Sequence, residues 1–177
     1  KEDKRDSRKI AKSLRNGELV GIYIPGKGME ELRGLVRYRK TLVKEISRHK
    51  CRIKSFIYFN GIKIPLEQDG ISNHWSGRFT HWLREVQLST VHGKMVLDET
   101  VDTAELLRKK LLKVNRHLRQ VVRNGEYSEK LRLLQSIPGI GLVSAITRLT
   151  EMEDILRFRN LDQLCSFVGL VPSTNSS

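Results

Sequence analysis

Two stretches of this sequence combine residue types and spacings that could carry chemistry. The first is the segment IPGIG at residues 137–141, which lies between two segments with helical apolar patterns. Pro138 disfavours α geometry at the residue before it and has no N–H to donate, so it ends the first helix. The glycines leave the N–H groups of a second helix, expected to begin at Leu142, without side-chain bulk in front of them. Open amides at the positive end of a helix dipole form a phosphate site.

This segment follows a hydrophobic-x-Gly-hydrophobic-Gly pattern and is similar to the turn of the DNA-binding helix-hairpin-helix. We expect Ser128 to cap the first helix, which runs from Glu129 toward Ser136, and we expect Ile137 and Ile140 to lie inside. The candidate nucleic-acid contacts of the turn are Pro138, Gly139, Ile140 and Gly141. The alternative is a glycine-containing turn that joins two packed helices and binds no ligand.

The second stretch is an Asp-x-x-Asp pair, Asp3 and Asp6, at the start of a predicted helix that ends at Asn16-Gly17. Residues three apart share one side of a helix. Two carboxylates on one face could therefore share a hard divalent cation such as Mg²⁺. In the alternative interpretation Asp6 caps the helix and Asp3 favours the positive end of its dipole.

The composition favours a polyanionic partner. The 177 residues carry a formal net charge of +13, with a pI of about 10.0. Nucleic acid is the first candidate for such a basic chain, and an anionic membrane surface is the second. No apolar run approaches the roughly 20 residues that span a bilayer, and no signal-peptide pattern is present. Cys51 and Cys165 have neither metal-ligand nor disulfide-framework spacing, which suits a reducing cytosol.

Apolar residues at steps of three and four predict two long helices, and the fold class is therefore mainly α. The first extends from Met29 to about Phe59, and the second from Val91 or Asp98 to Asn124, with Gly125 as its C-cap. The second has the pattern of a coiled-coil seam. The two helices could pack on each other as an antiparallel pair, or pair with another subunit. In either case they form an arm.

The arm is basic along its length and could lie against a phosphate backbone, although its charges could instead be solvated faces. The candidate nucleic-acid contacts on its second helix are Arg108, Lys109, Lys110, Arg116, Arg119 and Arg123.

Shorter patterns fill the rest of the chain. Leu19–Ile24 is apolar and β-branched, and we expect a strand or an extended buried connection there. Trp75, Phe79, Trp82 and Leu83 have helical spacing and should fill the junction between longer helices. Asn160 can cap a helix that continues to Val168. His74 and His81 could share a helix face, but packing accounts for them better than a metal does.

The order of these pieces resembles that of the DEDD transposases of bacterial insertion sequences, the group that includes the Piv invertase and the bridge-RNA-guided recombinases. An Asp-x-x-Asp helix opening comes first and a long helical spacer follows. Next come LLQSIPGIGLVSA at 133–145 and then ILRFRNLDQLCSFVGLVPSTNSS at 155–177, which contains Phe158. The resemblance covers essentially the whole chain.

The resemblance implies a RuvC-like domain with an RNase H fold, in which four acidic residues hold Mg²⁺. Asp3 and Asp6 match the last two, and the other two are expected upstream of this chain. Ser176 and Ser177 match the place of the family's serine nucleophile, and we favour Ser177. The expected division is residues 1–27 as a short remnant of the RuvC-like α/β domain, 28–125 as a helical coiled-coil arm, and 126–177 as a small helical domain with the hairpin.

The resemblance also implies partners. These are DNA, a guide RNA, and further copies of the chain joined through the coiled-coil arm, in the bacterial cytoplasm near the nucleoid. A fragment that lacks the upstream carboxylates should bind nucleic acid without recombining DNA. Two alternatives remain open, namely a non-catalytic module that binds nucleic acid and a helical oligomerisation scaffold. Bulky residues at Gly139 and Gly141 should weaken DNA binding in all but the scaffold.

Overall fold

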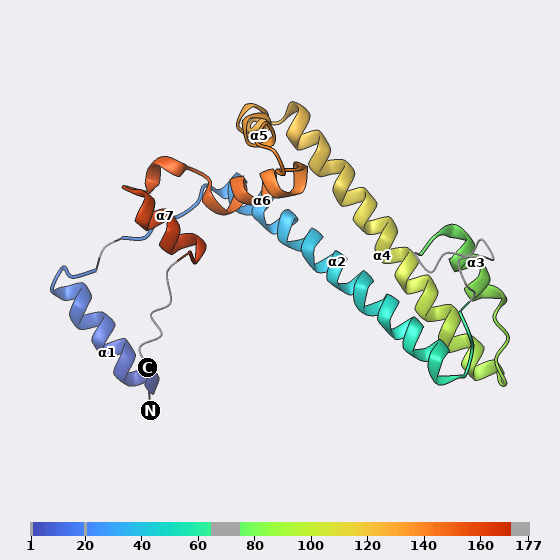
Figure 1. Cartoon of the computed structure of the whole chain (residues 1–177). Coiled ribbons are helices and arrows are strands. Elements are labelled where there is room, and N and C mark those ends of the chain that lie inside the picture. Colours follow the sequence, from blue (N-terminus) through green and yellow to red (C-terminus); the bar gives the residue numbers. More distant parts are fainter. Residues whose placement is uncertain (1, 20, 65–74, 171–177) are drawn as a thin grey trace, which may run out of the picture.

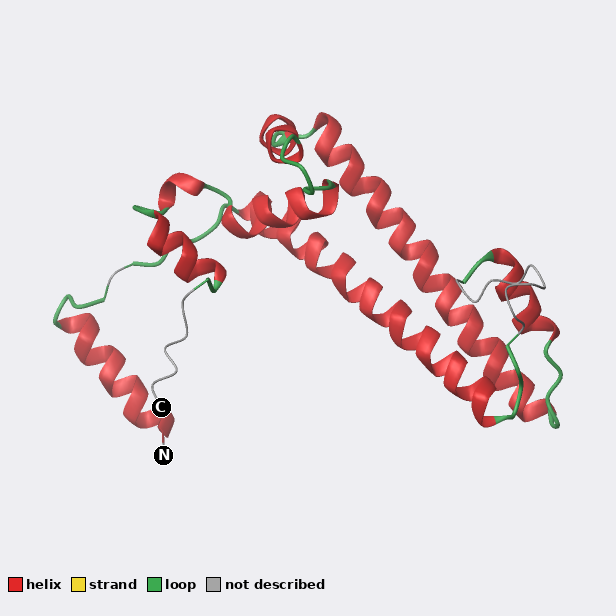
Figure 2. Ribbon diagram, in the orientation of Figure 1, coloured by secondary structure: helices red, strands yellow, loops and turns green. Residues whose placement is uncertain are grey.

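The computed structural model describes residues 2–19, 21–64 and 75–170, and the chain is mainly α, as predicted (Figure 1). No β-strand occurs within these ranges (Figure 2). The helices are α1 (Glu2–Arg15), α2 (Lys27–Phe59), α3 (Gly77–Glu85), α4 (Val91–Asn124), α5 (Ser128–Gln135), α6 (Leu142–Met152), the short 3-10 helix η2 (Ile155–Arg157) and α7 (Leu161–Val168).

The two long helices, α2 and α4, run antiparallel along each other and form the arm of the molecule (Figure 1). Their apolar stripes face one another, so that Val36 and Leu42 of α2 share a core with Val114 and Leu118 of α4. The long helices therefore pair within one chain, which is the first of the two predicted arrangements. The bounds of both helices agree with the prediction, with α4 starting at Val91.

A separate apolar core lies at each end of the arm. At the end that carries α3, Phe79 and Leu83 are fully buried against Ile53 and Ile57 of α2, together with the start of α4. The predicted junction role of this short helix is therefore confirmed. At the other end, α5 and α6 bury their apolar residues against α2 and α4, and the fully buried side chains there include Leu118, Leu131 and Ile146.

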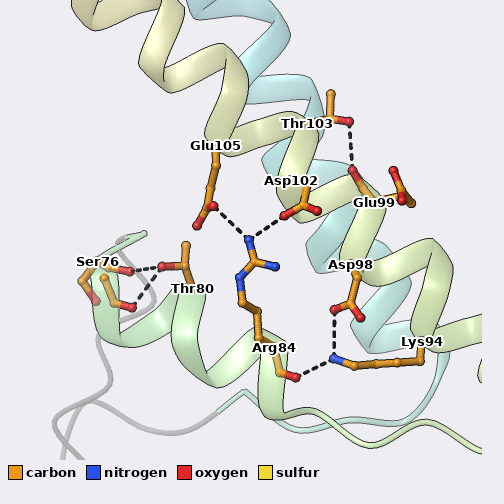
Figure 3. Close-up of polar contacts among 10 residues, drawn as sticks. Ser76, Thr80, Arg84, Lys94, Asp98, Glu99, Asp102, Thr103 and Glu105 are labelled. Atoms are coloured by element: carbon orange, nitrogen blue, oxygen red, sulfur yellow. Dashed lines mark hydrogen bonds and ion pairs between the residues drawn. The ribbon is translucent and has the colours of Figure 1, made fainter.

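Polar contacts fix the short helices to the arm. Arg84 of α3 donates through Nη2 to Asp102 Oδ1 at 2.6 Å and to Glu105 Oε2 at 2.9 Å, both on α4 (Figure 3). Lys94 Nζ donates to the backbone oxygen of Arg84 at 2.6 Å and pairs with Asp98 at 2.9 Å. These contacts hold the end of α3 on the first turns of α4.

The connection between α1 and α2 differs from the prediction. Residues 21–24 are extended, but they form neither a strand nor a buried connection, since Ile22 is 85% and Ile24 79% exposed. A β-branched run needs a neighbouring strand to complete its backbone hydrogen bonds, and the described part of the chain offers none. The described residues before α2 therefore consist of α1 and an exposed linker.

Helix starts were predicted with mixed success. Asn160 caps α7 as expected, because its Oδ1 accepts a hydrogen bond from the N–H of Gln163 at 2.9 Å. Two other caps were wrong. Ser128 is the first residue of α5, after Tyr127 as N-cap, and α1 already begins at Glu2, so Asp6 lies inside it. None of the helices in the described ranges is both long and apolar enough to cross a bilayer.

Candidate nucleic-acid interface

The turn between α5 and α6 exposes the start of α6. Gly139 has φ of +84°, a backbone conformation that favours glycine, and it faces open space. Gly141 is the N-cap of α6, with φ −80° and ψ 173°, and no side chain caps the helix there. Its backbone conformation is open to any residue, so what glycine contributes at 141 is the absence of bulk.

The first amides of α6 have no protein partner. Within the described residues, the N–H groups of Leu142, Val143 and Ser144 make no backbone or side-chain hydrogen bond, and the first helical bond runs from Ala145 N to Gly141 O at 2.9 Å. Free donors at the positive end of the helix dipole are the arrangement that binds a phosphate oxygen.

Arginines from two further helices gather beside this helix end. A cavity of about 590 Å³ is lined by Arg119 and Arg123 of α4, Arg132 and Gln135 of α5, and Leu142, the first residue of α6. In the part of the chain that the structure describes, none of these arginines has an acidic partner. We call this set, with the α6 amides, the hairpin cavity. Its chemistry suits a phosphodiester.

The structure therefore brings together part of the predicted set. Arg119 and Arg123 lie at the hairpin, whereas Arg132 and Gln135 were not singled out from the sequence. Pro138 and Ile137 are exposed, which makes the expected inward position of Ile137 wrong, because it is 49% accessible. Ile140 packs against the core as predicted.

The remaining basic candidates on α4 diverge around its axis. At about 100° per residue, Arg108 lies about 20° from Arg119, so these two share a face, whereas Lys110 points about 180° away from Arg119. Lys109 and Arg116 lie between these directions, roughly 60° to 80° from Arg119. All of these side chains are exposed. A single phosphate backbone that lies along α4 can therefore reach only part of the predicted set.

The predicted carboxylate pair is exposed on α1, which lies apart from the arm (Figure 1). Among the described residues no group of three or more His, Cys, Asp or Glu side chains could hold a metal ion. Asp3 and Asp6 alone do not make a complete divalent-metal site, which needs further oxygen ligands. The candidate nucleophiles, Ser176 and Ser177, lie outside the described residues, as does His74. His81 pairs with Glu85, at 3.1 Å.

Two family models match this chain. The model described as "Transposase" of the DEDD IS110 type matches residues 1–59, and the model described as "Transposase IS116/IS110/IS902 family" matches residues 131–177. Together these matches cover more than half of the chain. The second contains the hairpin turn, α6 and α7.

Curated proteins named as transposases are also similar. A protein of Sinorhizobium fredii named as transposase y4qE is 27% identical over 177 residues, which is 100% of this chain and 41% of the relative. The transposase for insertion sequence element IS1533 of Leptospira borgpetersenii is 20% identical over 90% of this chain and 45% of its own length. The chain thus spans less than half the length of these relatives. No solved structure matches.

Proposed function

We propose, since this chain belongs to the IS116/IS110/IS902 family of DEDD transposases, that it supplies the DNA-holding part of a recombinase of a bacterial insertion sequence. The observation that carries the proposal is the hairpin cavity. There Arg119, Arg123, Arg132 and Leu142 line one space. Leu142 is the first residue of α6, whose first amides have no partner within the described residues. Contacts of this kind hold the sugar-phosphate backbone and do not read base sequence.

The amides and the arginines would divide the task of binding. The α6 amides donate to one phosphate oxygen without side-chain entropy cost, because the helix already orients them. The arginine side chains offer paired N–H donors to the neighbouring oxygens. The arm holds both sets in register, since α5 and α6 pack on α4 and α2.

The catalytic step belongs to the whole protein. DEDD transposases generally use a divalent metal, and our proposal is that Asp3 and Asp6 contribute to a Mg²⁺ site with acidic residues from outside this chain. The described residues do not complete that site. Ser177 or Ser176 is proposed as the nucleophile. Its hydroxyl oxygen would bond to a backbone phosphorus while one P–O bond to a sugar breaks, and that sugar leaves as a hydroxyl after taking up a proton. Attack of a sugar hydroxyl on the serine-linked phosphorus would then release the serine, so strand exchange is divided into reversible steps.

The proposed partners are DNA, a guide RNA and further copies of the chain, in the bacterial cytoplasm near the nucleoid. The apolar seam of the arm is used within the chain, so contacts between copies would use its outer surface. The proposed division into residues 1–27, 28–125 and 126–177 places the hairpin cavity at the boundary of the last two regions. This chain alone should bind DNA and should not cut it with Mg²⁺.

The variant Gly141→Asp tests the hairpin. Aspartate suits the extended backbone at this N-cap and faces open space, so it should stabilise α6 by a few tenths of a kcal/mol. Its carboxylate would occupy the α6 amides and repel a phosphate. We expect the affinity for a 30-base-pair duplex to fall about tenfold at low salt, as measured by fluorescence anisotropy.

Gly28→Asp is the matched control. It makes the same change of charge in the first turn of α2, where a side chain meets nothing within 4 Å. Its duplex affinity should remain close to that of the parent chain. Equal affinities of Gly141→Asp and Gly28→Asp would refute the proposed role of the hairpin.

A further inference from the structure

A second cavity lies along the arm, separate from the hairpin. It encloses about 280 Å³ between α2 and α4 beside the start of α3. Its apolar walls include Ile46, Val101 and Leu111, and its polar lining includes Lys50 and Arg108, with the ring of Trp75 at one side. We call it the tryptophan pocket. Its volume lies just below that of most ligand pockets, roughly 300–1,000 Å³, so it suits one small unit and not an extended segment.

The tryptophan ring is held in place. Trp75 meets the edge of Phe79 with the ring centroids 5.1 Å apart, and Phe79 is fully buried in the core at this end of the arm. Lys50 Nζ lies 5.3 Å from the centroid of the Trp75 ring. A fixed ring beside a cation offers a stacking surface next to an anion-binding group.

Two cations and one carboxylate line the pocket, and the cations are not paired with that carboxylate. Within the described residues Lys50, Lys54 and Arg108 form no ion pair. The lining carboxylate, Glu105, accepts a hydrogen bond from Arg84 (Figure 3). Burial, and then the charges of Arg108 and Lys54, lower the pKa of Lys50. An anion placed between these cations would relieve their mutual repulsion.

We propose that the tryptophan pocket binds one nucleotide of a single-stranded polynucleotide, with the base stacked on Trp75 and a phosphate between Lys50 and Arg108. The inference rests on the proposed function for the nature of the partner, but it concerns a different site. A single strand is required because a base within a duplex must leave its stack and its pair before it can reach a side-chain ring.

Tryptophan fluorescence tests the proposal directly. Trp82→Phe leaves Trp75 as the one tryptophan of the chain, whose sequence contains two. We expect a 20-nucleotide single strand of thymidine or uridine to quench its emission, and a duplex of equal length to quench it far less. A free nucleoside monophosphate should bind at least tenfold more weakly than the strand, because it lacks the flanking phosphate contacts.

In the Trp82→Phe background, Lys50→Gln combined with Arg108→Gln should lower the affinity for the single strand, as measured by quenching, about tenfold. Lys44→Gln combined with Lys113→Gln is the matched control, since both lysines are exposed on the same two helices away from the pocket. Circular dichroism checks that each variant keeps its helices, and the single changes Lys50→Gln and Arg108→Gln serve if the pair unfolds.

The same titration is repeated with Gly141→Asp. Quenching by the single strand should persist there while duplex affinity falls, so failure of the hairpin proposal and failure of this one can be told apart. Three results would overturn the inference: absence of quenching by the single strand, equal quenching with and without the two cations, or equal affinity for the free nucleotide and the strand.

Discussion

Gly125 ends α4 and shows why a glycine can be required without a positive φ. Its φ is −82° and its ψ 167°, angles that other residues adopt readily. Its N–H donates to the carbonyl oxygen of Val121 at 3.0 Å. A Cβ added to Gly125 would clash with that same oxygen. Any side chain at 125 must therefore displace the last turn of α4, beside the hairpin cavity.

We predict that Gly125→Ala lowers the free energy of unfolding by about 1–3 kcal/mol through this clash. Gly34→Ala is the informative comparison, because Gly34 lies in the exposed interior of α2 and a Cβ there meets nothing within 4 Å. It should raise the free energy of unfolding by up to about 1 kcal/mol. Urea denaturation followed by circular dichroism measures both, and equal stability of the two variants would contradict the prediction.

At the scale of single residues, the sequence indicated types of contact better than their details. Asn160 was identified as a cap because the amide oxygen of asparagine competes well for the free amides of a helix. Ile137 was placed inside because it is apolar, but burial depends on which neighbour the turn faces, and Ile137 faces solvent. Gly139 has a positive φ, whereas Gly141 does not.

Among the elements, α2 and α6 are joined by a polar clamp. Arg37 donates through Nε and Nη2 to both carboxylate oxygens of Glu151, at 2.9 and 2.8 Å. Arg33 Nε donates to the backbone oxygen of Thr150 at 2.6 Å. The hydrogen bond from Arg37, aided by nearby positive charges, lowers the pKa of Glu151. The clamp holds the end of α6 opposite the hairpin.

Acid should release this clamp. The pKa of Glu151 is lower in the folded than in the unfolded chain. The contribution of its carboxylate to the free energy of unfolding is therefore complete above the unfolded value of 4.5. It is lost as the pH falls below 4.5 through the folded pKa. The pair is partly exposed, so we expect Glu151→Gln to cost about 1 kcal/mol or less near pH 7. That difference from the parent chain should shrink toward zero below about pH 4.

Urea denaturation at a series of pH values checks this, with Glu31→Gln on α2 as the control, since Glu31 is exposed and its carboxylate makes no ion pair within the described residues. A Glu151→Gln deficit that stays constant from pH 7 to pH 3 would show that the clamp does not depend on the charge of Glu151.

The arginines that α4 and α5 place in the hairpin cavity predict how the affinity for duplex DNA depends on salt concentration. If Arg119, Arg123 and Arg132 contact phosphates, changing all three to Gln should reduce the slope of log affinity for a duplex against log salt by up to about 2.7. The matched change at Lys44, Arg52 and Lys113, which are exposed elsewhere on the arm, should leave most of the slope intact. Anisotropy titrations at roughly 50 to 200 mM salt, a range in which such slopes are measurable, compare the two triple variants. Equal slopes would place the phosphate contacts elsewhere.

The elements themselves were largely predictable from the sequence. Apolar steps of three and four over some thirty residues leave few alternatives to a long helix, and both predicted helices are present. The prediction of a strand at Leu19–Ile24 was wrong for the opposite reason. A strand depends on a partner elsewhere in the chain, so a local run of β-branched residues does not determine it.

For the whole molecule, packing decides which basic residues act together. Arg132 and Gln135 lie on α5, which follows α4 after a short turn. Only the packing of α5 beside α4 places them with Arg119. Sequence reasoning grouped Lys110 with Arg108, but the helix directs them to different sides. The candidate catalytic residues show the same limit, because Asp3 and Asp6 lie on a helix that stands apart from the hairpin (Figure 1).

One face of α4 connects the two cavities. Arg108 lines the tryptophan pocket, and Arg119 and Arg123 line the hairpin cavity. Arg108 and Arg123 are separated by about 22 Å along the axis, at about 1.5 Å per residue. One nucleic-acid molecule could therefore occupy both cavities if it were double-stranded at the hairpin and single-stranded at the pocket. At about 3.4 Å per nucleotide, the span corresponds to roughly six or seven nucleotides.

We therefore predict that a duplex with a single-stranded extension of about ten nucleotides binds more tightly than the duplex or the strand alone, because the second contact becomes intramolecular. An extension of about two nucleotides is too short to reach and should add little. Lys50→Gln with Arg108→Gln should remove the gain from the long extension while the affinity for blunt duplex changes much less. Anisotropy competition among the blunt duplex, the strand and the two extended duplexes measures the gain. A gain that is the same for both extension lengths, or that survives loss of the two cations, would mean that the pocket and the hairpin do not hold one molecule together.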